Sequence, residues 1–97
     1  MTNEELATLI QSGERDKALE LWRQVRYFAL QQANRWVRIG RGGVTLEDLQ
    51  QAAFLGFLDA LDSWDGNKGA FITWFSFALK KAFKEATGQS TKRERMD

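Results

Sequence analysis

The stretch DLQQAAFLGFLDALDSWDGNKGAFITWFSFALKKAF, residues 48–83, contains two amphipathic helical patterns joined by a short turn. The first pattern begins where Thr45 and Asp48 form a capping-box sequence, with Asp in place of the usual Glu or Gln. Its apolar residues recur at helical spacing, and the predicted inner side comprises Leu49, Ala53, Gly56, Phe57, Ala60, Leu61 and Trp64. Gly56 inside a helix costs about 1 kcal/mol relative to Ala, so we expect another helix to cross closely there.

The second pattern follows a turn at residues 65–69, DGNKG. It predicts a helix from about Ala70 to Thr87, with Gly88 as its C-cap. The remaining residues, 89–97, are polar and are expected to form a flexible tail.

Two further helices are predicted upstream. A short one starts at Thr2 or Asn3 and reaches Gln11, and a long one runs from about Glu14 to Ile39 before the Gly40–Gly43 loop. No segment shows the alternation typical of strands. The sequence therefore predicts an all-α, compact bundle of about four helices in one domain, residues 1–88: a short first helix, a long second helix and two packed helices after the loop.

The composition excludes several function classes. Cysteine and histidine are absent, which excludes disulfides, thiolate chemistry and the usual zinc sites. No apolar run approaches the roughly 18 residues of a membrane span, and the polar start is unlike a secretory signal, so a cytoplasmic protein is expected. We expect no enzyme, cofactor or metal. The alternative is a divalent-cation site at Asp59 and Asp62, which share a helix face with one another, although a solvated acidic face is commoner.

The last predicted helix carries aromatic residues on two faces. One arc holds Phe71 and Phe75 with other apolar residues. Trp74 and Phe77 fall on the opposite arc, and Lys81 and Lys84 continue the same line. Unpaired bases stack on aromatic faces and lysines follow phosphates, so this arc is typical of a single-stranded nucleic-acid platform. Packing of both rings against the long second helix is the alternative.

Charge is distributed in blocks along the chain. Residues 21–44 contain five arginines and no acid, whereas residues 45–70 contain five acids and one lysine. The blocks indicate one acidic and one basic face. The arginines of the long helix, Arg23, Arg26, Arg35 and Arg38, either contact DNA or pair with acids of neighbouring helices.

Residues 48–83 resemble the second conserved region of bacterial RNA polymerase sigma factors, the sigma-70 family. That region has the pattern D-L-x-Q, then G-L-x-x-A, an aromatic–Asp pair, a glycine turn and F-x-T-aromatic. The matching residues here are Asp48, Leu49, Gln51, Gly56, Phe57, Ala60, Trp64, Asp65, Gly69, Phe71, Thr73 and Trp74. The opening EELATLIQSGERDKALELW, residues 4–22, also resembles the smaller members of the family.

The resemblance implies a helical bundle with two partners. One is core RNA polymerase, whose β′ coiled coil docks on one helix, and by position this role falls to Asp48, Leu49, Gln51, Leu55 and Leu58. The other is promoter DNA, whose single-stranded nontemplate −10 element is captured as the duplex melts in transcription initiation. By position, DNA binding falls to Phe71, Thr73, Trp74, Phe77, Lys80, Lys81 and Lys84. An anti-sigma factor is a further candidate partner.

The chain also departs from the family pattern. Ala52 and Phe54 stand where the family often has an acid and a small or polar residue, and Phe77 keeps half of an aromatic pair. Lys81 and Lys84 replace the frequent Gln and Thr readers, so a promoter preference unlike the housekeeping consensus is expected. No −35-binding segment follows in these residues, and a piece of a longer sigma factor is expected rather than a stand-alone protein. The alternative function is a helical protein-interaction module that docks on polymerase or another partner without DNA melting.

Overall fold

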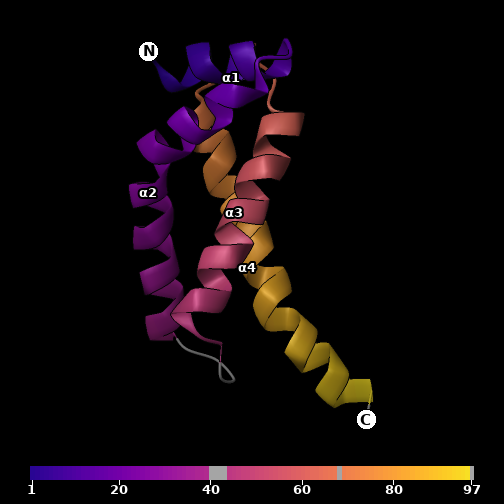
Figure 1. The fold of residues 1–97 in the computed structure, drawn as a ribbon. Coiled ribbons are helices and arrows are strands. Elements are labelled where there is room, and N and C mark those ends of the chain that lie inside the picture. Colours follow the sequence, from indigo (N-terminus) through magenta and orange to yellow (C-terminus); the bar gives the residue numbers. More distant parts are fainter. Residues whose placement is uncertain (40–43, 68, 97) are drawn as a thin grey trace.

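The computed structural model describes residues 1–39, 44–67 and 69–96, with side chains for 1–38, 44–67 and 69–87. Within these ranges it is helical, without strands, and the predicted all-α bundle is confirmed (Figure 1). The elements are α1 (Asn3–Gln11), a 3-10 turn η1 (Arg15–Lys17), α2 (Ala18–Ile39), α3 (Leu46–Ser63) and α4 (Phe71–Met96). The predicted Gly40–Gly43 loop lies outside the described residues.

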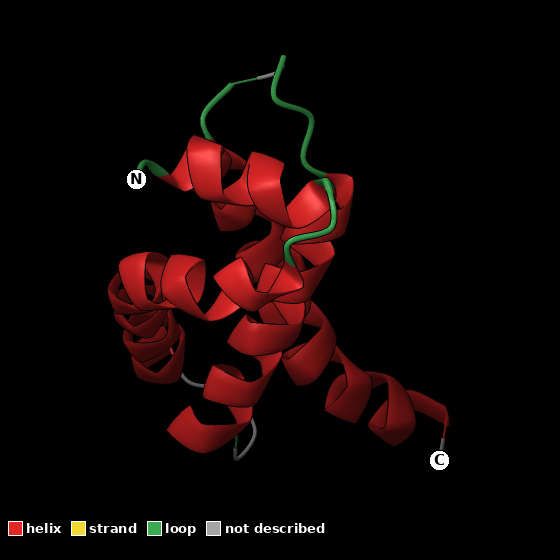
Figure 2. Ribbon diagram, turned by 45° about the horizontal axis from the view of Figure 1, so that its top comes forward, coloured by secondary structure: helices red, strands yellow, loops and turns green. Residues whose placement is uncertain are grey.

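The helices form a three-helix body with α1 across one end. α3 and α4 pack along each other, and α2 packs against both of them. α1 contacts all three at the end where α3 turns into α4, and Figure 2 shows it lying crosswise over that end. The final part of α4 projects beyond the other helices (Figure 1).

Phenylalanine side chains fill the centre of the bundle. Phe57 from α3 meets Phe75 from α4 edge to face, with ring centroids 5.9 Å apart, and Phe71 stacks on Phe75 at 6.1 Å. Phe83 continues the same buried row along α4. Every residue of the predicted inner side of α3, from Leu49 to Trp64, is buried. Burial of these large side chains is the main force holding the three helices together.

The absence of a side chain at Gly56 allows α3 and α4 to approach closely. A Cβ at this position would lie 3.2 Å from the carbonyl oxygen of Ala78 and 3.4 Å from the Cβ of Ala82. The expected close crossing at Gly56 is therefore confirmed.

Side chains cap the N-termini of α1 and α3. The predicted capping box of α3 is present, because Thr45 Oγ1 accepts a hydrogen bond from the Asp48 amide at 3.1 Å and the Asp48 carboxylate accepts one from the Thr45 amide at 3.1 Å. Thr2 and Glu5 make the same pair of bonds at α1. The bond from the Thr2 amide lowers the pKa of Glu5 below its ordinary value of 4.5.

α1 is hydrogen-bonded to both ends of the α3–α4 turn. Glu4 Oε2 accepts from the Phe71 amide, the first of α4, at 2.8 Å. Gln11 Nε2 donates to the carbonyl oxygens of Leu61 at 2.9 Å and Trp64 at 2.7 Å, at the end of α3. Two side chains of α1 thus satisfy backbone groups that helix termini leave unpaired.

Two predicted helix limits are wrong. The second helix was expected from about Glu14, but η1 occupies Arg15–Lys17 and α2 begins at Ala18. The tighter turn of η1 redirects the chain from α1, which lies crosswise, into α2. Gly13, which precedes η1, has a φ of 119°, a backbone conformation that residues with a side chain rarely adopt. α4 continues through Gly88 to Met96, because a helical glycine costs only about 1 kcal/mol and the following residues tolerate helix. The flexibility of residues 89–97 stays a prediction.

Candidate nucleic-acid interface

Two aromatic side chains of α4 point away from the core. Trp74 is 37% exposed and Phe77 is 59% exposed, which confirms the predicted outward orientation. The indole N–H of Trp74 donates a hydrogen bond to Ser63 Oγ at 2.8 Å, so its ring rests on the end of α3 and not on α2. This bond leaves the ring partly exposed and fixes its orientation.

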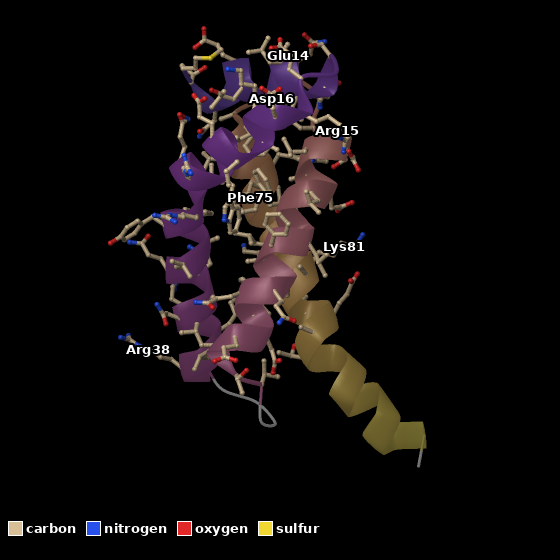
Figure 3. All side chains as sticks on the ribbon, viewed as in Figure 1. Glu14, Arg15, Asp16, Arg38, Phe75 and Lys81 are labelled. Atoms are coloured by element: carbon tan, nitrogen blue, oxygen red, sulfur yellow. The ribbon has the colours of Figure 1, made fainter. Side chains whose placement is uncertain are left out.

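Both rings border a groove between α3 and α4. Its wider part has a volume of about 360 Å³ and is lined by Asp59, Ser63, Trp74, Phe77, Ala78 and Lys81. A narrower part of about 190 Å³ shares three of these residues and is lined by Leu55, Gly56, Asp59, Ala78, Lys81, Ala82 and Glu85. We call the two parts together the α3–α4 groove. In Figure 3, Lys81 projects outward at this groove, beside α3.

The chemistry of the α3–α4 groove suits a planar, polar ligand. Trp74 and Phe77 offer apolar ring surface, and Ser63 and Asp59 offer hydrogen-bonding oxygens. Lys81 adds one positive charge beside the carboxylate of Asp59. Aromatic surface with nearby donors and acceptors is the combination with which proteins hold unpaired bases.

The other residues predicted to bind DNA lie in two environments. Thr73, Lys80 and Lys84 are exposed on the outer side of α4 beside the aromatic pair. Phe71, in contrast, is 0% exposed and packs edge to face on Trp64 at 5.9 Å. The structure therefore places the Phe71 side chain in the core and not on the exposed side of α4, and a direct role in DNA binding stays a prediction.

The residues predicted to bind polymerase mostly share the outer face of α3. Asp48, Gln51, Leu55 and Leu58 are exposed, with Leu55 at 65% and Leu58 at 39%. Leu49 is 1% exposed, so its side chain is placed in the core and not on this face, which corrects its direct role. Helical spacing explains the difference, because Leu49 and Leu55 are six residues apart in the sequence and therefore about 120° apart around the axis of α3.

Sequence reasoning missed three contributors to these surfaces. Ser63 orients Trp74, Asp59 lines the groove, and Phe54 is 43% exposed beside the outer face of α3. Asp59 was considered only as a metal ligand. Its position on the flank of α3 facing α4 depends on how the two helices pack, which no spacing along the chain reveals.

The described residues also bear on the expectations about a metal site and a membrane span. In this part of the chain, no three metal-ligating side chains gather to form a metal site, so Asp59 and Asp62 gain no third ligand. No helix among the same residues has the length and apolarity needed to cross a bilayer.

Comparison with known proteins gives one match. A family model described as Sigma-70 region 2 matches residues 19–92, which span α2, α3 and most of α4. No curated protein and no solved structure matches the chain.

Proposed function

The chain belongs to the sigma-70 family through its region 2, and on that premise we propose that it binds core RNA polymerase and captures the unpaired nontemplate strand of the promoter −10 element. Sigma-70 region 2 places the chain in transcription initiation, with core polymerase and promoter DNA as its partners in general. The division of the two tasks between α3 and α4 is the proposed part.

The observation that supports strand capture is the exposed pair Trp74 and Phe77 at the α3–α4 groove. A base that leaves the duplex loses stacking worth a few kcal/mol. An aromatic ring restores about 1–3 kcal/mol per base, and a ring already held by Ser63 loses little entropy on binding. Lys81 and its exposed neighbours on α4 neutralise phosphates and release their counterions. The chain thus stabilises the opened strand without making or breaking a covalent bond.

Polymerase binding is assigned to the outer face of α3. Leu55 and Leu58 expose apolar surface between the polar side chains of Asp48 and Gln51. Apolar anchors surrounded by polar groups are typical of protein interfaces. Leu58 lies toward the start of α2, where it lines a hollow with Ala18, and Leu55 lies toward α4, at the edge of the α3–α4 groove.

Strand capture is tested with Trp74→Ala and a fluorescein-labelled single-stranded oligonucleotide carrying the −10 nontemplate sequence. We expect binding weaker by about 1–3 kcal/mol, measured by anisotropy, because one stacking surface is lost. Tyr27→Ala is the matched control, since Tyr27 is 74% exposed but lies on α2. The affinity of Trp74→Phe should lie between those of Trp74→Ala and the unaltered chain, because this variant keeps a ring and loses the hydrogen bond to Ser63. Equal affinities for Trp74→Ala and the unaltered chain would refute strand capture.

Polymerase binding is tested with Leu55→Asp in a pull-down of bacterial core RNA polymerase. A charge at the centre of the proposed apolar face should weaken capture by at least about 1–2 kcal/mol. The same Tyr27→Ala control should bind normally. Undiminished capture by Leu55→Asp would remove α3 from the interface.

A second candidate function is a docking module that does not hold DNA. The exposed apolar side chains of α3, to which Phe54 adds a third, favour it. This function would be supported if the chain captured polymerase while substitution of Trp74 or of the α4 lysines left the affinity for DNA unchanged.

A further inference from the structure

The two parts of the α3–α4 groove meet at a carboxylate and an ammonium group. Asp59 from α3 and Lys81 from α4 line both the wider part, which Trp74 borders, and the narrower part. The wider part, at about 360 Å³, lies within the roughly 300–1,000 Å³ common for ligand pockets. A base stacked on Trp74 therefore shares one hollow with Asp59, and its hydrogen-bonding edge can meet this carboxylate.

The ring that receives the base has a fixed orientation relative to α3. Ser63 Oγ accepts a hydrogen bond from the indole N–H of Trp74 at 2.8 Å and donates its own proton to the carbonyl oxygen of Asp59 at 2.8 Å. Ser63 and Asp59 are four residues apart, which is about one helical turn. The indole and the Asp59 carboxylate are thus attached to the same turn of α3, and a ligand that meets both of them finds the site preorganised.

The charge of the groove favours a base over backbone phosphate. Asp59 and Glu85 contribute two carboxylates and Lys81 one ammonium group. A phosphate beside a carboxylate is repelled, whereas the N–H groups of a base are attracted to it. An ionised carboxylate accepts hydrogen bonds and donates none, and its two oxygens can receive two parallel N–H donors. The preferred ligand is therefore a base that presents such a pair.

Guanine is the base that fits a two-oxygen acceptor best. On its Watson–Crick edge N1–H and the 2-amino group lie side by side, whereas adenine, cytosine and thymine each present one N–H-bearing nitrogen there. Proteins read this edge in single strands, where the bases are splayed out. In a duplex both donors of guanine are already bonded to cytosine, so only an unpaired guanine can offer them to Asp59.

We propose that Asp59 is a specificity-determining residue of the α3–α4 groove and selects an unpaired guanine. The guanine N1–H and 2-amino groups donate to the Asp59 carboxylate while the base stacks on Trp74. The proposal rests on the strand-capture function above and adds a sequence preference to it. Stacking alone does not supply that preference, because every base has a π-face.

The test measures binding of the full chain to short, fluorescein-labelled strands that carry a single base among abasic sites. The base is guanine, hypoxanthine, adenine or thymine, and hypoxanthine differs from guanine only in lacking the 2-amino group. Anisotropy at low salt should show the guanine strand bound about 3- to 10-fold more tightly than the hypoxanthine strand, because one hydrogen bond to the carboxylate is lost. The thymine strand should bind no more tightly than the hypoxanthine strand.

Asp59→Asn should change which base is preferred. The substitution replaces two acceptors by one acceptor and one donor group, the set that pairs with adenine. The variant should lose the preference for guanine over hypoxanthine and bind the adenine strand more tightly than the guanine strand. A purely structural role for Asp59 would weaken all strands without changing their order.

Asp62→Asn is the matched control, because it removes the same charge from an exposed side chain of α3 that does not line the α3–α4 groove. It should keep the order of the unaltered chain. Thermal unfolding of Asp59→Asn should match the unaltered chain, since the side chain is exposed and Ser63 donates to the backbone carbonyl of this residue.

Two results would overturn this proposal alone, provided that Trp74→Ala is still defective toward the −10 strand. One is equal binding of the guanine and hypoxanthine strands by the unaltered chain. The other is a guanine preference that Asp59→Asn retains. No binding of any strand by the unaltered chain at low salt, the −10 oligonucleotide included, would overturn strand capture as well.

Discussion

The two grooves beside α4 share one helix and differ in charge. The α3–α4 groove combines Asp59 and Glu85 with Lys81 and has Trp74 at its edge. The groove between α2 and α4, called the α2–α4 groove, contains Arg35 and Lys80 without an acid and is lined by Phe28, Gln32, Arg35, Trp36, Ser76 and Lys80. A carboxylate repels phosphate and accepts hydrogen bonds from base amino groups, and a pair of cations does the reverse.

The difference shows that a single helix can have two flanks of opposite charge character. The partner helices set part of the chemistry, because α3 supplies Asp59 to one flank of α4 and α2 supplies Arg35 to the other, whereas Glu85 belongs to α4 itself. Asp59 comes from the acidic block of the sequence, residues 45–70, and Arg35 from the basic block, residues 21–44. Three substitutions test whether the two grooves depend on the same scaffold or can be altered separately.

The largest effect on stability is expected from Phe75→Ala. This substitution should disturb both grooves and so remove the difference between them. Phe75 is 0% exposed, packs on Phe28 beneath the α2–α4 groove and on Phe57 of α3, and lies between the helices in Figure 3. Loss of the ring should lower the free energy of unfolding by about 3–5 kcal/mol, measured by urea denaturation. A loss below 1 kcal/mol would show that the two flanks are not supported by a common core.

A smaller effect, confined to one groove, is expected from Gly56→Val. The added side chain would press on Ala78 and Ala82, so α3 and α4 must separate at a cost of about 1–3 kcal/mol. The α3–α4 groove, which Gly56 lines, changes shape, and the α2–α4 groove does not. Oligonucleotide binding, measured by anisotropy, should therefore weaken. Gly56→Ala provides the graded control, since its single methyl requires a shift of only a few tenths of an ångström.

The smallest effect is expected from Glu4→Ala, which acts on the end of α4 nearest Trp74. It removes the acceptor for the Phe71 amide and should cost about 0.5–2 kcal/mol of stability, as other N-cap losses do. Glu4→Gln keeps a carbonyl oxygen in place and should recover part of the loss. Amide hydrogen exchange at Phe71 reports the bond directly, and unchanged protection in Glu4→Ala would contradict this role.

The sequence predicts those features that depend on local spacing. A local motif predicts the capping box of Thr45 and Asp48, which is present. Helical periodicity predicts the buried side of α3 and the outward orientation of Trp74, and both are observed. The family positions of Leu49 and Phe71 predict direct contact with a partner, whereas both side chains are buried in the structure. Periodicity itself places both residues on the inner arcs of their helices.

Features that join distant segments were not predictable from spacing. The bond between Ser63 and Trp74 depends on the distance between two helices, which Gly56 sets. The α2–α4 groove needs Arg35 and Lys80, which are 45 positions apart, to face each other across packed aromatic rings. Charge blocks indicated that α2 is basic, but not which arginine turns toward α4.

The hydrogen bonds from Glu4 and Gln11 have a practical consequence for work on this domain. They connect the first eleven residues to the middle of the chain, although the family match begins only at residue 19. A protein shortened to the matched segment would lack α1, and with it the hydrogen bonds that hold the α3–α4 turn next to Trp74. Affinity tags and fusion partners are therefore better attached away from the amino terminus, so that these hydrogen bonds stay intact.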